Sequence, residues 1–211
     1  MFAVLRSLVV GLVFLAGGVT ADGDPPSITP KAEWIKAQLD QMDVESKWPA
    51  GVHIDWRTGL PDGEPESLVG KHTHCSAFVA AAAERLGVYI LRPPEHPQLL
   101  LANAQNEWLQ SDGAAQGWRR LADASAAQDA ANLGFLVVAS YHNRNDAKPG
   151  HIAIVLPGAK SLSALALEGP DVMQAATTNS ARISLRDGFA GHRGAFEGER
   201  ILFFAHAVDA P

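Results

Sequence analysis

The sequence predicts an α+β fold with helices packed on one face of an antiparallel sheet. Helical periodicity dominates as far as residue 133, and two strongly apolar, strand-like runs then flank a short polar turn. Further short strand patterns continue almost to the end of the chain. No repeat or low-complexity tract divides the sequence, so we expect residues 22–211 to form a single domain.

Residues 1–21 have the order of a secretory signal. Arg6 precedes an apolar stretch over residues 8–19, and small residues lead up to Ala21, after which we expect cleavage. The apolar stretch is short for a membrane span, and no later segment is apolar enough for one. The sequence therefore predicts a periplasmic or secreted protein with no membrane span once the signal is removed. An uncleaved N-terminal anchor is the alternative.

Helices are predicted where apolar residues recur every three or four positions. Thr29 and Pro30 suit the cap and first turn of the first helix. Its apolar stripe comprises Trp34, Ile35, Leu39 and Met42. Further helices are predicted over residues 75–86, 98–109 and 125–133. Residues 48–70 are rich in Gly, Pro and Asp and predict irregular structure, with 52–57 as a short strand or a loop facing substrate.

Strands are predicted from residue 135 onward. Residues 135–141 and 151–156 are apolar runs on either side of the polar turn 142–150, which favours an antiparallel pair. Shorter strands are expected at 172–175, 183–185 and 201–206, with a short extended piece at 117–121. The formal net charge of −6 and the lack of a basic stripe argue against a nucleic-acid partner.

The single cysteine, Cys75, is the strongest chemical signal. One thiol in an exported protein cannot form an internal disulfide, so Cys75 is either reactive or a small buried residue. It stands where the helix over residues 75–86 begins. The free N–H groups and positive dipole end of a helix favour a thiolate, so we expect a lowered pKa. The same N–H groups can stabilise an oxyanion.

A thiol nucleophile needs a base and a group that orients the base. His151 opens a predicted strand at the rim of the sheet, where it can face the end of a helix, and is the candidate base. Gln174, on the next predicted strand, is the candidate orienter, with Asn179 and Glu168 in reserve. The alternatives are an exposed strand-terminal histidine and an ordinary edge-strand glutamine.

Three short motifs carry a family resemblance. The segment His74-Cys75-Ser76-Ala77-Phe78-Val79 is similar to the Asp-Cys-Ser-Gly-Phe-Val signature of NlpC-type cell-wall peptidases. Residues 149–155 resemble the Gly-His-Val-Gly-Ile-Tyr strand of that family. Val172-Met173-Gln174-Ala175 stands where the family has an apolar pair followed by His-Ala, and related CHAP amidases place Glu or Asn nearby. The resemblance spans roughly residues 50–180.

The resemblance implies a papain-like fold and hydrolysis of amide bonds in peptidoglycan stem or cross-link peptides. Cys75 would be the nucleophile, His151 the base and Gln174 the third member, with no metal or organic cofactor. The chain departs from the family pattern at three positions: His74 replaces Asp, Ala77 replaces Gly, and Gln174 replaces His.

Three further residues are assigned to substrate binding. Trp56 is expected to line the cleft, Arg57 to bind a substrate carboxylate, and His74 to contact substrate where the family has Asp. Four other histidines are expected to be surface or structural residues: His53, His96, His192 and His206.

Several alternatives stay open. One is a zinc site built from His72, His74 and Cys75 with His142 and His151, although its spacing matches no finger pattern and adjacent ligands are awkward. Another is a wall-binding module without activity. A third is the same chemistry on another acyl donor, in an acyltransferase, a protein-directed protease or a secreted toxin, with any inhibitor or immunity partner undetermined.

Overall fold

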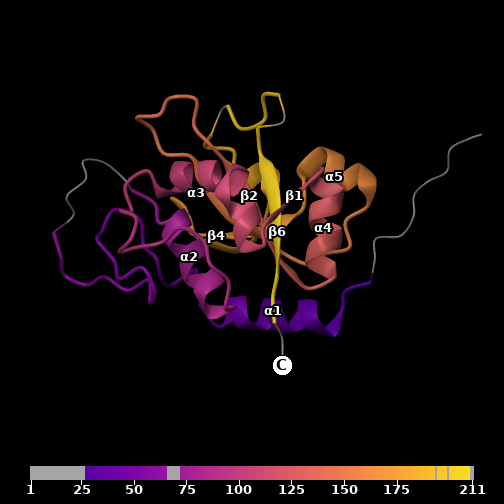
Figure 1. Ribbon diagram of the computed structural model, residues 1–211, viewed down its shortest axis with the longest axis horizontal. Helices are drawn as coiled ribbons and strands as arrows, with labels where there is room; N and C mark the ends of the chain where they lie inside the picture. The colour runs from indigo at the N-terminus through magenta and orange to yellow at the C-terminus, as the bar shows by residue number, and fades with distance from the viewer. Residues whose placement is uncertain (1–26, 66–71, 193, 199, 210–211) are drawn as a thin grey trace, which may run out of the picture.

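The computed structural model describes residues 27–65, 72–192, 194–198 and 200–209 (Figure 1). Six α-helices, one short 3-10 helix and six strands lie within these residues. The expected signal, residues 1–21, lies outside them. No helix in the described ranges is both long and apolar enough to cross a membrane.

The strands form one antiparallel sheet in the order β1-β6-β2-β3-β4-β5. Their bounds are β1 Arg119–Leu121, β2 Phe135–Tyr141, β3 His151–Val155, β4 Asp171–Gln174, β5 Ser180–Ser184 and β6 Leu202–Ala207. The central pair β2 and β3 has the expected hairpin register, with Val137 opposite Val155 and Tyr141 opposite His151. The prediction of an α+β fold with an antiparallel sheet is therefore confirmed.

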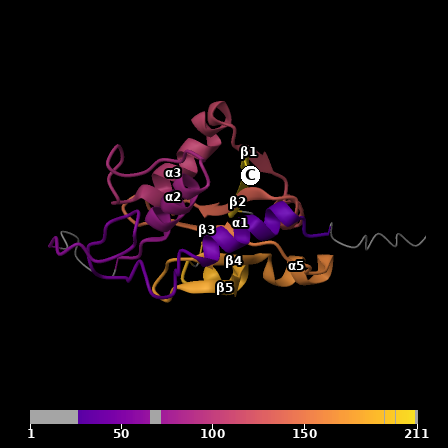
Figure 2. The same cartoon turned by 90° about the horizontal axis from the view of Figure 1, so that it is seen from below.

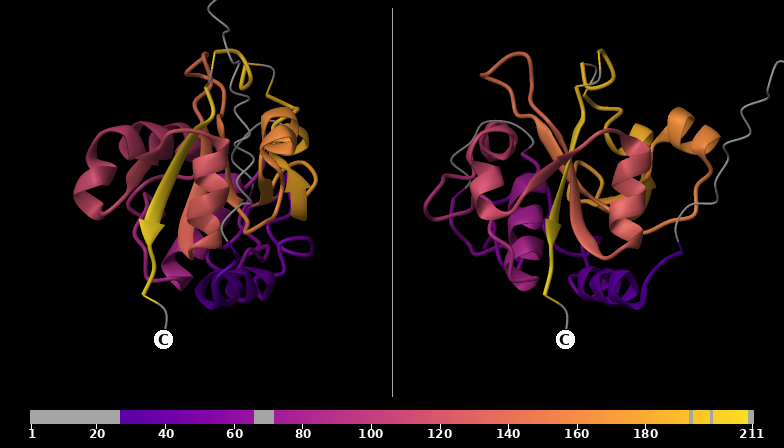
Figure 3. Two further views of the ribbon diagram at one scale, coloured as in Figure 1. Left: turned by 90° about the vertical axis from the view of Figure 1, so that its right-hand side faces the viewer. Right: turned by 45° about the vertical axis from the view of Figure 1, so that its right-hand side comes forward.

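Helices cover both faces of this sheet. Residues of α1 (Pro30–Asp40), α2 (Cys75–Arg85) and α3 (Leu101–Gln110) share one apolar cluster with one face. On the other face, α4 (Ala124–Asn132) joins a second cluster, and α5 (Leu162–Glu168) lies beside α4. Figure 3 shows α2 and α3 on one side of β6 and α4 and α5 on the other.

The expectation that helices occupy one face alone is wrong. Alternate residues of the central strands are apolar on both faces, with Val138 and Ile152 in one cluster and Val137 and Ala153 in the other. A strand that is apolar on both sides needs cover on both sides. The second layer is completed by the short helix α6 (Leu185–Gly188).

Local sequence signals explain most helix boundaries. The Thr29 side chain caps α1 as expected, by accepting a hydrogen bond from the N–H of Ala32 at 3.2 Å. α3 begins at Leu101, later than expected, because Leu100 adopts a left-handed conformation with φ of 56°. Three short helices were not predicted from the sequence: α5, α6 and the 3-10 helix η1 (Asp112–Gln116).

The helix α2 lies close against the sheet. All nine residues from Cys75 to Ala83 are buried, and five of them are alanines, whose small side chains let the helix backbone approach the strands. α2 packs chiefly on β3 and also contacts β4 (Figure 2). Residues 52–57, expected as a strand or a loop, form only an isolated bridge between Ile54 and Pro61.

Candidate active site

Cys75 is the first residue of α2, and its side chain is buried. The preceding residue, His74, occupies the N-cap position, but its side chain does not cap the helix. The ring Nε2 of His74 instead lies 2.9 Å from the carbonyl oxygen of Val52. The thiol therefore sits at the positive end of a helix whose first turn is not capped by His74.

Burial raises the pKa of the Cys75 thiol, because a thiolate is poorly solvated at this position. Hydrogen bonds from the backbone of Ile152 and Ser76, and one with the Thr73 side chain, lower this pKa without outweighing burial. The expectation of a lowered pKa from the helix terminus is thus wrong. The cysteine is a neutral thiol at pH 7, and it lies beside the backbone of Ile152, the residue that follows His151.

His151 is the first residue of β3, and only 2% of its surface is exposed. Its Nε2 lies 2.7 Å from Oε1 of Gln174, the last residue of β4. The two meet because β3 and β4 run antiparallel, so the start of one strand lies at the same end of the sheet as the end of the other. An amide oxygen only accepts, so Nε2 carries the hydrogen of this bond.

Burial lowers the pKa of His151 to about 4, and the hydrogen bond with Gln174 opposes that shift only in part. The ring is consequently neutral at pH 7. The tautomer with hydrogen on Nε2 leaves Nδ1 with the lone pair that a base needs. Within the described residues, the thiol of Cys75 and the ring of His151 share no hydrogen bond, an arrangement common before substrate binds.

The structure separates Gln174 from the two reserve candidates. The amide group of Asn179 donates to the carbonyl oxygens of Val44, Lys47 and Trp48, so it anchors the chain after α1. The side chain of Glu168 pairs with Lys160 at 3.1 Å. Of the three candidates for the orienting group, Gln174 is the one that contacts His151.

Cys75, His151 and Gln174 all line one cavity of about 1160 Å³. Six of the eight histidines line it: His53, His72, His74, His96, His151 and His192. One wall is formed by prolines and leucines between Pro93 and Leu101, and another by hydroxyl side chains between Thr177 and Ser180. Asp187 is the one described lining residue with a fixed charge.

The residues expected to bind substrate divide into two groups. His74 lines the cavity. Trp56 and Arg57 are not among its described lining residues, so their expected place in the cleft is not found. Arg57 instead binds the carboxylate of Glu84, at 2.7 and 3.1 Å, and stacks over the ring of Trp56. The charge of Arg57 is thus paired with that of Glu84 outside the described lining of the cavity.

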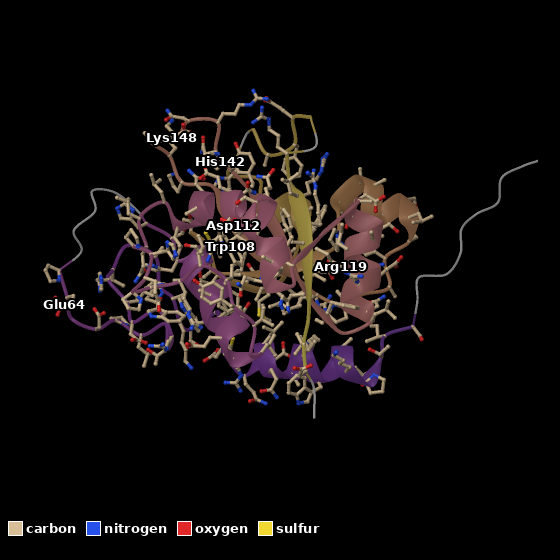
Figure 4. All side chains as sticks on the ribbon, in the orientation of Figure 1. Glu64, Trp108, Asp112, Arg119, His142 and Lys148 are labelled. Atoms are coloured by element: carbon tan, nitrogen blue, oxygen red, sulfur yellow. The ribbon has the colours of Figure 1, made fainter. Side chains whose placement is uncertain are left out.

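Asn103 on α3, which the sequence analysis did not single out, fastens the loop before His151. Its amide donates to the carbonyl oxygen of Lys148 at 3.0 Å, and its oxygen accepts from the N–H of Asn143 at 3.2 Å. His142 and Lys148 lie on this loop between β2 and β3 (Figure 4). No spacing pattern in the sequence links an asparagine on one helix to a turn some 40 residues later.

The histidines expected to be surface or structural include three that line the cavity, His53, His96 and His192. Of these three, His192 contacts the candidate base, because its ring stacks on that of His151. One residue of the alternative zinc site lies apart from the others: His142 binds Glu107 at 2.9 Å and is not among the described residues that line the cavity. Among the described residues, no group of three or more His, Cys, Asp or Glu side chains is arranged to hold a metal ion.

No protein-family model and no curated protein sequence matches this chain. The resemblance to NlpC-type peptidases therefore depends on the three short motifs, and a family assignment remains an expectation. What the structure adds is independent of any family: a thiol at a helix N-terminus and a histidine held by a glutamine face one cavity.

Proposed function

We propose that this chain is an exported cysteine hydrolase that cleaves amide bonds in peptidoglycan stem or cross-link peptides. The observation that carries the proposal is the convergence of Cys75, His151 and Gln174 on one cavity from α2, β3 and β4. The order of nucleophile, base and orienting group matches the family motifs. The signal-like N-terminus supports a periplasmic or secreted location.

The first half of the reaction forms a thioester. The sulfur of Cys75 attacks the carbonyl carbon of the scissile amide while its proton passes to Nδ1 of His151. The backbone N–H groups at the start of α2 stabilise the negative charge that develops on the carbonyl oxygen. The C–N bond then breaks, and His151 returns the proton to the departing amine.

The second half consumes water. His151 takes a proton from a water molecule, whose oxygen attacks the thioester carbonyl, and the C–S bond breaks. The proton then returns to the sulfur of Cys75, and a carboxylic acid product leaves. Throughout, Gln174 accepts the Nε2–H hydrogen bond and thereby fixes the tautomer and orientation of the ring.

Neutral partners suit this buried site. A thiolate and an imidazolium held in advance would each be poorly solvated, and burial shifts the pKa values of Cys75 and His151 against both charges. Proton transfer during attack avoids separate charges in the resting protein, because sulfur loses its proton as it bonds to carbon. The cavity walls, one apolar and one rich in hydroxyl groups, suit an extended peptide.

Mass spectrometry of defined muropeptides tests the proposal. Wild-type protein should release new amine and carboxylate ends from a stem or cross-link peptide, and Cys75→Ala should release none. His142→Ala is a matched control, because this histidine lies on the loop before β3 but binds Glu107. Muropeptides that stay intact after incubation with folded wild-type protein would contradict the proposed substrate. Equal cleavage by wild type and Cys75→Ala would contradict the assignment of Cys75 as the nucleophile.

The same assay separates the competing functions. An acyltransferase would join the acyl part of the substrate to an added amine in preference to water. An inactive wall-binding module would bind peptidoglycan without cleavage, to the same extent in wild type and Cys75→Ala. A protein-directed protease would leave muropeptides intact and cleave a denatured protein in a manner that depends on Cys75.

A further inference from the structure

Two aromatic rings contact the imidazole of His151, and a third packs behind one of them. The ring of His192 stacks on it, with 4.9 Å between centroids and 17° between planes. The ring of Phe189 meets it edge-on, at 4.6 Å and 72°. Tyr141 packs against His192 from β2, at 5.8 Å. With the Gln174 bond at Nε2, the His151 ring is held at one edge and covered on one face.

The backbone fixes His192 in this place. Its N–H donates to the carbonyl oxygen of Phe189 at 2.9 Å, and its own carbonyl oxygen accepts from the N–H of Ala195 at 2.8 Å. Both Phe189 and His192 belong to the turn that follows α6. The turn is close-packed on Tyr141, whose hydroxyl would lie 2.7 Å from a Cβ placed on Gly194.

His192 also lines the cavity, whereas Phe189 is fully buried behind it. The stacked ring thus lines the cavity and covers one face of His151. A ring in this position does two things: it holds the plane of the base and keeps water from its face. The alternative, a core histidine with no bearing on catalysis, would be expected to lie away from the cavity.

We propose that His192 is a positioning residue for His151, which fixes the plane of the catalytic ring by stacking and shields it from the water in the cavity. The role depends on the proposed function only in so far as His151 is the general base. The stacked geometry and its effect on the titration of His151 can be measured without any substrate.

Other ionisable groups near His151 define the background against which this effect is measured. Tyr141 lies opposite His151 on β2, and the other ionisable residues that line the same cavity are Cys75, Asp187, His53, His72, His74 and His96. Burial, and to a lesser extent the charge of a protonated His151, lower the pKa of His192 to about 4, so two stacked protonated rings are unfavourable. At pH 7 both rings are neutral, and the effect of His192 on His151 is shielding rather than charge.

NMR of protein labelled at the histidine rings gives the direct test, with the His151 signal assigned by its loss in His151→Gln. In wild type, His151 should stay neutral from about pH 8 to pH 5. In His192→Ala, water reaches the open face, and the titration midpoint should move up toward the ordinary value of 6.5. In His192→Phe, an apolar ring replaces the imidazole, and the midpoint should remain low.

His192→Gln provides a second non-aromatic variant should the alanine variant not fold, and it should behave as His192→Ala does. His142→Ala serves as the control, because it removes a histidine bound to Glu107 and should leave the midpoint of His151 unchanged. A His151 midpoint in the Ala and Gln variants equal to that of wild type would overturn the proposal.

Activity gives a separate readout. If the His151 midpoint rises to about 6.5, the neutral fraction at pH 5.5 falls to about one tenth. His192→Ala should then lose about tenfold in kcat/KM between pH 7.5 and pH 5.5, while wild type and His192→Phe change little. A raised NMR midpoint without catalysis in any form would leave the shielding intact and contradict the proposed enzyme. If His192→Ala is active and its kcat/KM falls no more between pH 7.5 and pH 5.5 than that of wild type, the positioning role of His192 is contradicted and the proposed enzyme is not.

Discussion

Cys75 and His151 are neutral for the same reason: each is buried where its charged form is poorly solvated. A helix N-terminus lowers the pKa of a thiol only when its field exceeds the cost of desolvation. At Cys75 burial raises the pKa by more than the hydrogen bonds with Ile152, Ser76 and Thr73 lower it. In the proposed reaction, Cys75 is therefore activated during attack, by proton transfer to His151, and is not stored as a thiolate.

Alkylation of Cys75 should reflect this raised pKa. We expect its reaction with iodoacetamide to be slow at pH 7 and to increase only above the pH at which free cysteine ionises, near 8.5–9. The measurement is the alkylation rate of the single thiol between pH 5 and pH 10, with unfolded protein as the reference. A fast plateau that extends down to pH 6 would show a preformed thiolate and contradict the neutral pair.

Substitution of the three site residues should give graded losses. Cys75→Ala and His151→Ala should each reduce kcat/KM by about 10³-fold or more while the fold is retained. Gln174→Ala should cost less, about 10–100-fold, because it orients the base without exchanging a proton. Steady-state hydrolysis of a muropeptide measures these losses.

Asn179→Ala is the matched control for Gln174→Ala. It removes an amide of similar size whose bonds serve the chain after α1, so it should lower the free energy of unfolding by about 1–3 kcal/mol. Its kcat/KM should change little under conditions in which it is folded. A loss in Asn179→Ala as large as that in Gln174→Ala would remove the special role of Gln174.

The sequence was informative about residues that occupy defined ends of regular elements. Cys75 begins a helix, His151 begins one strand and Gln174 ends its neighbour, so pattern alone could bring them to one end of the sheet. It could not place Phe189 and His192, because both lie in a turn whose path is set by contacts with Tyr141 and His151. It also misjudged Arg57, whose partner Glu84 lies 27 positions away.

Among the elements, the loop before β3 controls the placement of His151. Gly150 sits so close to Tyr141 and Asn103 that a Cβ would lie 2.1 Å from the Tyr141 carbonyl oxygen and 2.5 Å from Oδ1 of Asn103. No side chain fits there without movement of the backbone. The glycine therefore lets the loop end tightly enough to deliver His151 to the cavity.

Gly150→Ala should displace the start of β3. We expect a loss of about 1–3 kcal/mol in the free energy of unfolding, measured by urea denaturation, together with reduced hydrolysis. Gly191→Ala is the matched control for stability, because nothing lies within 4 Å of its Cβ position. Equal stabilities for wild type and Gly150→Ala would contradict the close approach.

Elements with a clear helical period or a continuous apolar run were the predictable ones. α1, α2, β2 and β3 begin and end within about two residues of expectation. The helices α5 and α6 were omitted because they are short and their apolar patterns are weak. Each nevertheless has a serine N-cap, Ser161 and Ser184, and that was the usable signal.

For the whole molecule, the buried neutral histidines should make the free energy of unfolding fall as the pH is lowered. The pKa of His151 is about 4 in the folded protein and near 6.5 when the ring is exposed, so the unfolded chain binds more protons between those values. The stabilisation is complete above pH 6.5 and is lost as the pH falls toward 4. His151 alone accounts for up to about 3 kcal/mol of this change.

Urea denaturation at a series of pH values between 8 and 4 measures this dependence. In His151→Phe, which keeps a buried ring but has no proton to bind, the fall in stability below pH 6.5 should be smaller. An identical pH dependence in wild type and His151→Phe would show that His151 is not a neutral, buried group.

The central claim is that sulfur of Cys75 bonds to substrate while His151 moves the proton. Peptide mapping by mass spectrometry after acid quenching of a muropeptide reaction tests it most directly. We predict an acyl group on the fragment that contains Cys75, in amounts that fall sharply in His151→Ala, and no adduct or product with Cys75→Ala. Muropeptide cleavage by Cys75→Ala at the wild-type rate would contradict the account.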